Sequence, residues 1–450
     1  MKFRQINNLE VSLQIEGKTV PLGKLAWSRT NRRAAFTYFP QFIEQYRFNI
    51  SPVMPSGLKK TLDMQIAPPS PFDGLHGVFN DSLPDGWGRL LLDRRLQKVG
   101  IDHTSLTPLD RLSVIGKNGM GSLVYVPMLD DGQPQDHDLD WFVEQIVEVQ
   151  DHKATADIDT LQAAQGGSAG ARPKLMIGLN KELDSFVIDY GQPIPSNHEQ
   201  WIVKFRSQAD RSDIGIEEHA YALMAKAAGL TMADTHVIST SKGNHLFATK
   251  RFDRTNTGRL HMHTASGLLN VDHRYPHIDY QTLHQLTWNL TKESSEVARM
   301  FGHMAFNSYA HNRDDHSKNH AFLMGVDGKW QLSPAYDLTY SDGPGGEHSL
   351  AIGGEGRNPT EKHLLAVAKK ASIPLTVADT IIQQVRNAVE RWPEFADQAG
   401  LSKERSKELD KALNPNTKPR KGNSKVAEIA AQKISELRTL NRASSPSLKK

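Results

Sequence analysis

Residues 314–319 read Asp-Asp-His-Ser-Lys-Asn, and a further aspartate, Asp337, follows after two apolar runs. The runs cover 320–324 and 330–332 and flank Asp327-Gly328, a pair that between apolar segments predicts a β-hairpin. A helical pattern over 296–310 ends just before the six residues, which places them on a loop. The hairpin is expected to carry the chain back and to bring Asp337 beside that loop.

This order of acidic and amide side chains indicates phosphoryl transfer. An Asp, an Asn five positions later, a hairpin and another Asp is the arrangement of protein kinases, and the spacing selects Asp314 over Asp315. Asp314 would accept the proton of a substrate hydroxyl, and Lys318 would contact a transferring phosphoryl oxygen. Asn319 and Asp337 offer the oxygen ligands that Mg²⁺ prefers. The alternative is an Asx-rich turn that only caps a helix.

Three elements upstream occur in the order expected of a nucleotide site. Residues 166–170 form a glycine-rich loop whose N–H groups would lie over phosphates, with contacts predicted at Ser168, Ala169 and Gly170. A strand over 201–205 carries Lys204, which is predicted to pair the ATP phosphates. The helix over 217–228 begins at Glu217-Glu218, and Glu218 is favoured as the carboxylate that orients Lys204. The alternative is an edge-strand lysine that points to water.

Two further segments contain no motif whose residue spacing identifies a function. Residues 251–254 read Arg-Phe-Asp-Arg, so that Arg251 and Phe252 lie where a kinase hinge would contact adenine. An ion-paired structural turn is an equal alternative for this segment. His316 is placed in the same nucleotide-binding set. His261 and His263 lack a third ligand at a suitable spacing, which favours ordinary surface or strand residues over a metal site.

Composition limits the class of protein. With 450 residues, 38% of them hydrophobic and 23% charged, the chain predicts a globular protein of two or three subdomains. The chain contains no cysteine, signal-peptide pattern or apolar run near 20 residues, which indicates a cytoplasmic protein without a membrane partner. Because 54 Lys and Arg face 51 Asp and Glu, bulk charge does not indicate nucleic-acid binding.

The pattern along the chain predicts an α+β protein with a β-rich start and a mainly helical end. We expect a β-rich subdomain over 1–130, a mixed lobe over 131–255 that carries the glycine-rich loop and Lys204, and a helical lobe with a basic tail over 256–450. Within that tail, 414–424 predicts an exposed linker and 425–440 an amphipathic helix. The tail's basic residues would either touch DNA phosphates or form a solvated linker.

Several long motifs in order resemble one known family. The N-terminal motifs are Phe-Asn-Asp-Ser-Leu-Pro-Asp over 79–85 and Ile-Gly-Lys-Asn-Gly-Met-Gly over 115–121. Ala-Gly-Ala-Arg-Pro-Lys over 169–174 is similar to the family's phosphate-loop signature, and Ile-Val-Lys over 202–204, the 251–254 segment and the 314–319 motif follow. Over nearly its whole length the chain resembles the HipA toxins, the kinase halves of bacterial type II toxin–antitoxin pairs.

The resemblance implies more than the spacing does. It implies a two-lobed protein-kinase-like fold with an added N-terminal β-rich subdomain. It also implies a Mg²⁺- and ATP-dependent serine/threonine protein kinase with Asp314 as base, Asn319 and Asp337 on the metal, and Lys204 on the nucleotide. Family members phosphorylate a protein, in known cases an aminoacyl-tRNA synthetase, which stalls translation and leads to growth arrest or persistence. Each pairs with a helix-turn-helix antitoxin that binds operator DNA.

One position departs from the family pattern. The family autophosphorylates a serine of the glycine-rich loop, and this chain has Gly167 there, so the shifted Ser168 is the candidate for autophosphorylation. Two other functions stay open from the sequence alone. One is a kinase acting on a small molecule, because the same phosphate machinery serves many hydroxyl substrates. The other is a catalytically inactive corepressor that acts with the antitoxin on DNA.

Overall fold

A computed structural model describes residues 5–46, 48–55, 64–98, 100–102, 105–128, 137–153, 155–167 and 170–414. The chain divides into two compact units. The first, called the mixed unit, comprises Met1–Ile216, Ala233–Asp272 and Ala321–Trp330. The second, called the helical unit, comprises Glu217–Met232, His273–His320 and Gln331–Lys450.

The mixed unit begins with an antiparallel sheet in the order β4-β3-β2-β1-β5. Its strands are β1 (Asn8–Ile15), β2 (Lys18–Ser28), β3 (Arg33–Tyr38), β4 (Gln65–Ile66) and β5 (Leu123–Val126). Leu9, Val11 and Leu13 alternate along β1 and are fully buried, as the two-residue period of a strand requires. The accompanying helices are α1 (Pro40–Tyr46), α2 (Gly77–Asn80), α3 (Gly86–Lys98) and α4 (Pro108–Ile115).

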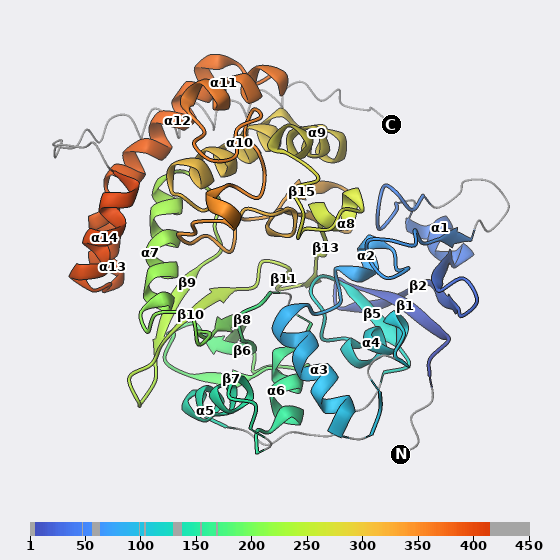
Figure 1. Cartoon of the computed structure of the whole chain (residues 1–450). Coiled ribbons are helices and arrows are strands. Elements are labelled where there is room, and N and C mark those ends of the chain that lie inside the picture. Colours follow the sequence, from blue (N-terminus) through green and yellow to red (C-terminus); the bar gives the residue numbers. More distant parts are fainter. Residues whose placement is uncertain are drawn as a thin grey trace. The chain divides into compact units, whose positions relative to one another are not determined.

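A second antiparallel sheet of the mixed unit has the order β7-β6-β8-β10-β9 and appears in green in Figure 1. Its strands are β6 (Lys174–Asn180), β7 (Phe186–Ile188), β8 (His198–Lys204), β9 (Thr235–Ser239) and β10 (His245–Lys250). Trp201 and Val203 of β8 are buried in one core with α5 (Leu139–Gln150) and α6 (Ile158–Gln165). Lys204 therefore projects from the opposite face of β8.

Two smaller sheets follow in the chain. The first pairs β11 (Arg254–Thr255) with β12 (Gly258–Arg259), and the second has the order β13 (His261–Thr264), β14 (Ala321–Met324), β15 (Trp330–Leu332). Helix α8 (Ala265–Leu269) comes directly after β13. The N–H of Gly328 donates to the carbonyl of Gly325 at 3.1 Å, which closes the turn between β14 and β15. The predicted hairpin is therefore confirmed.

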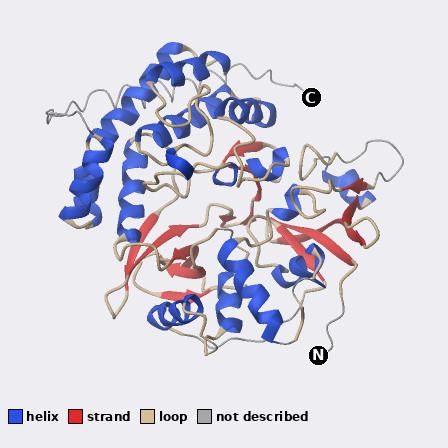
Figure 2. Ribbon diagram, viewed as in Figure 1, coloured by secondary structure: helices blue, strands red, loops and turns tan. Residues whose placement is uncertain are grey.

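The helical unit is built around α10, a helix buried along much of its length. Its helices are α9 (Tyr280–Thr291), α10 (Ser294–Tyr309), α11 (Glu361–Lys370), α12 (Leu375–Glu390), α13 (Trp392–Ala399) and α14 (Lys403–Leu413), together with most of α7 (Ile214–Ala227). Met300, Phe301 and Met304 of α10 are fully buried, and α10 packs against α9 and α12. Figure 2 shows that this unit is largely helical, whereas the mixed unit combines its sheets with several helices.

The α+β class predicted from the sequence is confirmed, with a β-rich start and a helical end. The helix predicted over 296–310 is α10, which begins two residues and ends one residue earlier than predicted. The predictions for 415–450, including the linker, the amphipathic helix and the DNA contact, lie outside the described residues. No described helix is long and apolar enough to span a bilayer. The three-part division at residues 130 and 255 stays a prediction.

Candidate active site

The predicted site residues divide between the two units. The mixed unit holds Lys204, Gly170, Arg251 and Phe252, while Ser168 and Ala169 lie outside the described residues. The helical unit holds the others, which are Glu218, Asp314, His316, Lys318, Asn319 and Asp337. One unit thus carries the predicted nucleotide lysine and the other carries the predicted acidic loop.

The acidic loop begins where α10 ends. Ala310 is the C-cap of α10, and the loop runs into the short 3₁₀ helix η2 (Ser317–Asn319). The two adjacent aspartates differ sharply in exposure, because the side chain of Asp314 is 60% exposed and that of Asp315 is fully buried. Only Asp314 of this pair can present its carboxylate to a ligand from solvent.

The segment that contains Asp337 runs beside this loop. The hydroxyl of Tyr336 donates to the carbonyl of Lys318 at 2.5 Å, and the N–H of Ser341 donates to the carbonyl of His311 at 3.0 Å. These contacts confirm that the chain returns to the loop after the hairpin. Asp337 has a φ of 57°, in the left-handed region that non-glycine residues seldom adopt and that is enriched at functional sites.

Asn319 contacts the main chain of Asp314, and His316 lies near its side chain. The Nδ2 of Asn319 donates to the carbonyl of Asp314 at 2.8 Å, which turns the amide oxygen, the atom a cation would bind, to the other side of the group. The Nε2 of His316 lies 3.9 Å from Oδ1 of Asp314. The predicted metal ligands, the carboxylate of Asp337 and the amide oxygen of Asn319, are hard-oxygen donors of the kind that Mg²⁺ prefers. In the described residues no group of three or more His, Asp or Glu side chains could hold a metal by itself.

Asp315 is the centre of a buried hydrogen-bond network that the sequence did not reveal. Its carboxylate accepts the hydroxyl of Tyr280 at 2.8 Å and the N–H of Ser349 at 2.8 Å, and it lies 2.9 Å from Nδ1 of His348. Burial, with the nearby charge of Asp315, raises the pKa of Tyr280 well above its usual value, so the hydroxyl stays protonated. Asn307 supports Tyr280 through a 2.9 Å bond from its Nδ2 to the hydroxyl oxygen. These partners lie far along the chain, so no local motif marks them.

Lys204 lies at the end of an interior strand of the mixed unit. β8 pairs with β6 on one side and β10 on the other, which excludes the edge-strand alternative. The Nζ of Lys204 lies 5.4 Å from the centre of the Phe247 ring on β10. Its contact with ATP phosphates stays a prediction.

Glu217 and Glu218 begin the helix predicted over 217–228, and the structure shows a partner for Glu217. Both Glu217 and Glu218 are buried on α7 within the helical unit. Glu217 accepts Nε of Arg405 on α14 at 2.8 Å. The carboxylate of Glu217 is therefore engaged in an ion pair within the helical unit. The preference for Glu218 as the partner of Lys204 stays a prediction.

Both described ends of the glycine-rich loop contact the N-terminal motifs. The N–H of Gly167 donates to the carbonyl of Asn118 at 3.1 Å. The N–H of Gly170 donates to the carboxylate of Asp85, and the N–H of Trp87 donates to the carbonyl of Gly170 at 3.3 Å. The sequence showed Asp85 only as the last residue of the 79–85 motif, and its anchoring of the loop was missed.

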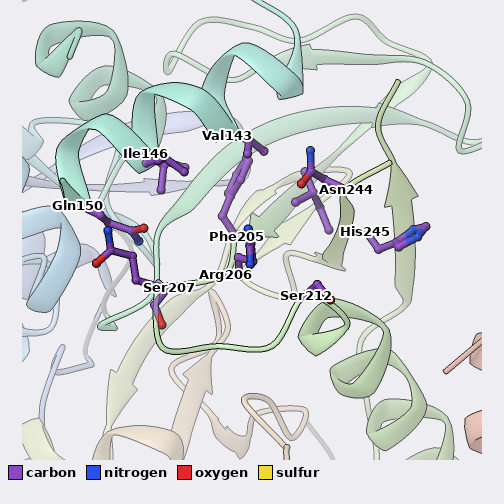
Figure 3. Close-up of a pocket in the computed structure, with 12 residues that line it drawn as sticks. Val143, Ile146, Gln150, Phe205, Arg206, Ser207, Ser212, Asn244 and His245 are labelled. Carbon is purple, nitrogen blue, oxygen red and sulfur yellow. The ribbon is translucent and has the colours of Figure 1, made fainter. Parts of the chain in front are cut away.

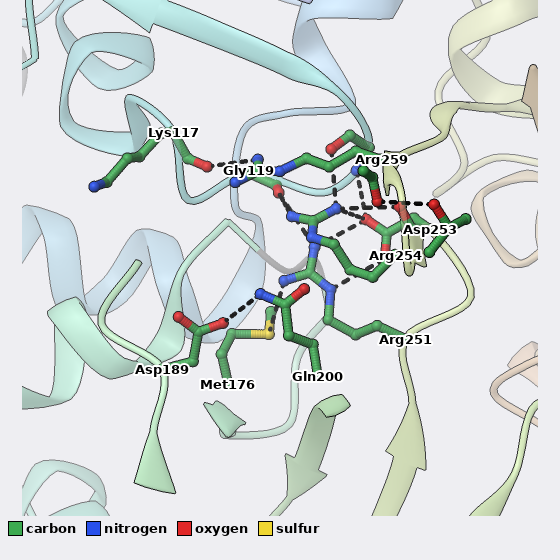
Figure 4. Close-up of polar contacts among 12 residues, drawn as sticks. Lys117, Gly119, Met176, Asp189, Gln200, Arg251, Asp253, Arg254 and Arg259 are labelled. Atoms are coloured by element: carbon green, nitrogen blue, oxygen red, sulfur yellow. Dashed lines mark hydrogen bonds and ion pairs between the residues drawn. The ribbon is translucent and has the colours of Figure 1, made fainter. Parts of the chain in front are cut away.

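Residues 251–254 form a buried ion-paired cluster (Figure 4). Asp253 is fully buried and accepts Nη2 of Arg251 at 2.8 Å, Nη1 of Arg254 at 2.6 Å and the N–H of Gly121 at 2.7 Å. Burial alone would raise the pKa of Asp253, but the two guanidinium groups hold it well below its usual range. Both arginines also donate to the carbonyl of Gly119, so the cluster ties this segment to the 115–121 motif.

The cluster supports the structural-turn interpretation of Arg251, and its nucleotide contact stays a prediction. Its guanidinium side chain is 2% exposed and donates to Asp253 and Gly119. The structural turn is therefore the observed arrangement for Arg251, and an adenine contact by this side chain would require those bonds to break. For Phe252 the nucleotide contact stays a prediction.

A separate cavity of about 200 Å³ lies in the mixed unit between α5, β10 and the segment after β8 (Figure 3). Its walls include Val143 and Ile146 of α5, Phe205, and His245 of β10. None of the predicted site residues lines it. The predicted site residues that the structure describes therefore do not form this cavity.

Two models of domains from one protein family match this chain in sequence order. A model of the HipA N-terminal domain matches residues 13–126, and a model of the HipA-like C-terminal domain matches residues 166–392. "Putative kinase Y4dM" of Sinorhizobium fredii is 24% identical over 280 residues, or 58% of this chain. The matched region spans 63% of the length of that relative.

One solved structure supports the fold over almost the full length. A chain in the complex of the Shewanella oneidensis MR-1 toxin–antitoxin system, formed by HipA, HipB and operator DNA, covers 96% of this chain. The similarity also covers 96% of that chain, with a TM-score of 0.63 and 18% identity. At this identity the likeness establishes the fold alone, which is an α+β kinase-like fold.

Proposed function

The chain belongs to the HipA family, and from that premise we propose that it is an ATP-dependent kinase that phosphorylates serine or threonine in a protein. The observation that carries the proposal is the acidic loop. An exposed Asp314, an oriented Asn319 and the left-handed Asp337 segment lie together in one unit, in the order that phosphoryl transfer requires. Transfer of this kind depends mainly on positioning and on neutralising charge.

Each residue of the loop has a chemical role in the proposal. Mg-ATP, when bound, supplies the phosphoryl group and the charge that neutralises it. Asp314 accepts the proton of the substrate hydroxyl, and its exposure keeps the carboxylate accessible to a protein substrate. Asn319 and Asp337 provide oxygen ligands to the metal. Lys318 contacts the transferring phosphoryl group.

The mixed unit supplies the nucleotide contacts of the proposal. Lys204 pairs with the ATP phosphates from an interior strand, which limits its freedom to move. Glu218 orients Lys204, and its neighbour Glu217 is paired with Arg405 instead. The glycine-rich loop covers the phosphates, and Asp85 holds one end of it through Gly170.

The family also supports a proposal about partners. We propose that a helix-turn-helix antitoxin neutralises the kinase and connects it with operator DNA, as in the similar complex of HipA with HipB and operator DNA. The proposed substrate is a component of translation such as an aminoacyl-tRNA synthetase, whose phosphorylation would arrest growth. Ser168 is the proposed autophosphorylation site.

Replacement of the base tests the function. Purified wild type and Asp314→Asn are incubated with Mg-ATP and a bacterial lysate, and phosphate is mapped by intact and peptide mass spectrometry. The variant should lose transfer by roughly 10²- to 10⁴-fold while nucleotide binding, measured by calorimetry, stays nearly unchanged. Phosphate on Ser168 in wild type only would establish protein phosphorylation. Label that accumulates on a metabolite instead would support the small-molecule alternative.

Asp327→Asn is the matched control for this experiment. Asp327 is an exposed aspartate in the β14–β15 turn, where its carboxylate accepts the N–H of Lys329 at 3.1 Å and lies 3.6 Å from Nζ of the same lysine. The control should transfer phosphate like wild type. Equal transfer by wild type and Asp314→Asn would refute the catalytic assignment, and no transfer by wild type in any lysate would favour the corepressor alternative.

A further inference from the structure

A second segment of the helical unit is bound to the acidic loop through Asp315. The Oδ1 of Asp315 accepts the N–H groups of Ser349 at 2.8 Å and Leu350 at 3.4 Å. Its Oδ2 accepts the hydroxyl of Tyr280 and faces Nδ1 of His348. One buried carboxylate therefore joins α9, the acidic loop and residues 348–350.

The residue before the catalytic aspartate binds the same segment from a second position. The carbonyl of Arg313 accepts both the N–H and the hydroxyl of Ser349 at 3.1 Å. Its guanidinium donates to the main-chain carbonyls of Asp342 at 3.4 Å and Arg357 at 3.2 Å. Residues 313 and 315 thus hold the segment over 341–357 at several points.

In many kinases a loop in this position is ordered by phosphorylation, because a phosphate pairs with arginine. Here the terminal nitrogens of Arg313 already donate to main-chain oxygens of the segment. The part of the segment that projects into solvent, residues 342–347, reads Asp-Gly-Pro-Gly-Gly-Glu and contains no hydroxyl side chain. This stretch therefore offers no site for an activating phosphate.

We propose that Asp315 is a positioning residue that fixes residues 341–350 against the acidic loop, so that the loop keeps its active geometry without phosphorylation of that segment. The effect on catalysis rests on the proposed kinase function, whereas the effect on the segment does not. A carboxylate suits this position because two main-chain N–H groups can only donate and need an acceptor that is already in place.

The hydrogen bonds that each replacement of Asp315 can still form predict the size of its effect. Asp315→Ala removes every acceptor and leaves buried N–H groups without partners. Asp315→Asn keeps one oxygen for Ser349 and Leu350, and the amide can donate to Tyr280 and His348, because a hydroxyl and an imidazole can reverse their roles. Asn should therefore recover most of what Ala loses, and that recovery separates hydrogen bonding from simple filling of space.

Hydrogen exchange read by mass spectrometry tests the proposal on the full-length protein. In Asp315→Ala, the amides of peptides covering 338–358 should exchange roughly 10- to 100-fold faster than in wild type, as expected for a lost hydrogen bond to a charged group. The kcat for transfer should fall by at least about tenfold with KM for ATP within about threefold, because Lys204 and the glycine-rich loop, the proposed phosphate contacts, belong to the mixed unit. Asp315→Asn should stay within about threefold of wild type in both.

Asp140→Ala is the matched control, because Asp140 is also a buried carboxylate that holds a loop. It accepts the hydroxyl of Ser241 at 2.6 Å, the N–H of Lys242 at 3.0 Å and Nδ2 of Asn244 at 3.1 Å in the mixed unit. This variant should lower stability but leave exchange over 338–358 and kcat as in wild type. If Asp315→Ala prevents folding, Tyr280→Phe, which removes only one donor, serves in its place and should produce a smaller shift in the same peptides.

Two outcomes would overturn the proposal. One is a folded Asp315→Ala with wild-type exchange over 338–358. The other is phosphate on 338–358 in the purified wild type whose removal by a phosphatase speeds exchange there. Absence of transfer by wild type would count against the proposed function only, because exchange still decides whether Asp315 holds the segment.

Discussion

Asp253 in the mixed unit and Asp315 in the helical unit are both fully buried carboxylates, but they are stabilised in different ways. Asp253 is surrounded by cations, with Arg251 and Arg254 both within 2.8 Å. Asp315 has no arginine or lysine among its hydrogen-bond partners and depends on a hydroxyl, an imidazole and main-chain N–H groups. The first arrangement balances buried charges, and the second orders a loop.

This difference predicts different consequences of losing each carboxylate. Without Asp253, two buried guanidinium groups would lose their counter-charge. Without Asp315, no buried cation is exposed to an apolar surrounding, and the loss is one of hydrogen bonds and of position. The mixed-unit cluster should therefore matter most for stability, and the helical-unit cluster for local order and rate.

The largest expected effect is that of Asp253→Ala. Removing one partner of a buried ion pair costs about 3–5 kcal/mol, because the remaining charge is left uncompensated. Urea denaturation followed by circular dichroism should show this decrease in the free energy of unfolding. Glu394→Gln breaks an exposed pair with Arg391 and serves as the control, with an expected change of at most about 0.5 kcal/mol. Similar values for the two variants would remove the basis of the comparison.

The second-largest expected effect is a loss of stability in acid, caused by protonation of His284 in the helical unit. Burial lowers the pKa of His284 to about 4, although its bond to the carbonyl of Tyr280 and the charge of Asp279 act in the opposite direction. Because the unfolded pKa is near 6.5, the neutral folded histidine stabilises fully above that pH, and the contribution is lost as pH falls from about 6.5 to about 4. The full loss is on the order of 3 kcal/mol.

His284→Gln removes this titration while keeping a side chain that can hydrogen-bond. Unfolding free energies of wild type and variant, measured in urea between pH 7.5 and 4.5, should converge as the pH falls. Parallel curves would show that His284 does not contribute to acid sensitivity. Asp253 should not contribute in this range, because its arginine partners hold its pKa well below the usual value and it stays ionised.

The smallest expected effect is that of Tyr280→Phe. The variant removes the hydroxyl's hydrogen bond to a charged group, which is worth about 2 kcal/mol, and the bond that Asn307 donates to the hydroxyl, while the buried ring stays in place. Thermal and urea unfolding should show this modest loss, and Asp315 should keep the segment at 348–350 through its remaining partners. A loss as large as that of Asp253→Ala would mean that Asp315 depends on charge compensation as Asp253 does.

Sequence patterns predicted the local elements well, because such elements depend on residues close together in the chain. The apolar runs and the Asp-Gly pair identified the β14–β15 hairpin, and the five-residue spacing to Asn319 selected Asp314, which is the exposed one of the two aspartates. The sequence did not identify Asp315 as a structural centre, because its partners are 33 to 35 positions away. The same holds for Asp85, which reaches Gly170 across 85 positions.

The sequence by itself determined the α+β class, the order of elements, the family and the candidate residues of the acidic loop. Only the tertiary structure decided which polar side chains are buried and what satisfies them. It placed Arg251 in an ion-paired cluster with Asp253 and assigned Asp315 to the segment at 348–350. The physical reason is that helices and turns follow from neighbouring residues, whereas a buried charge must find its partners wherever the folded chain brings donors within reach.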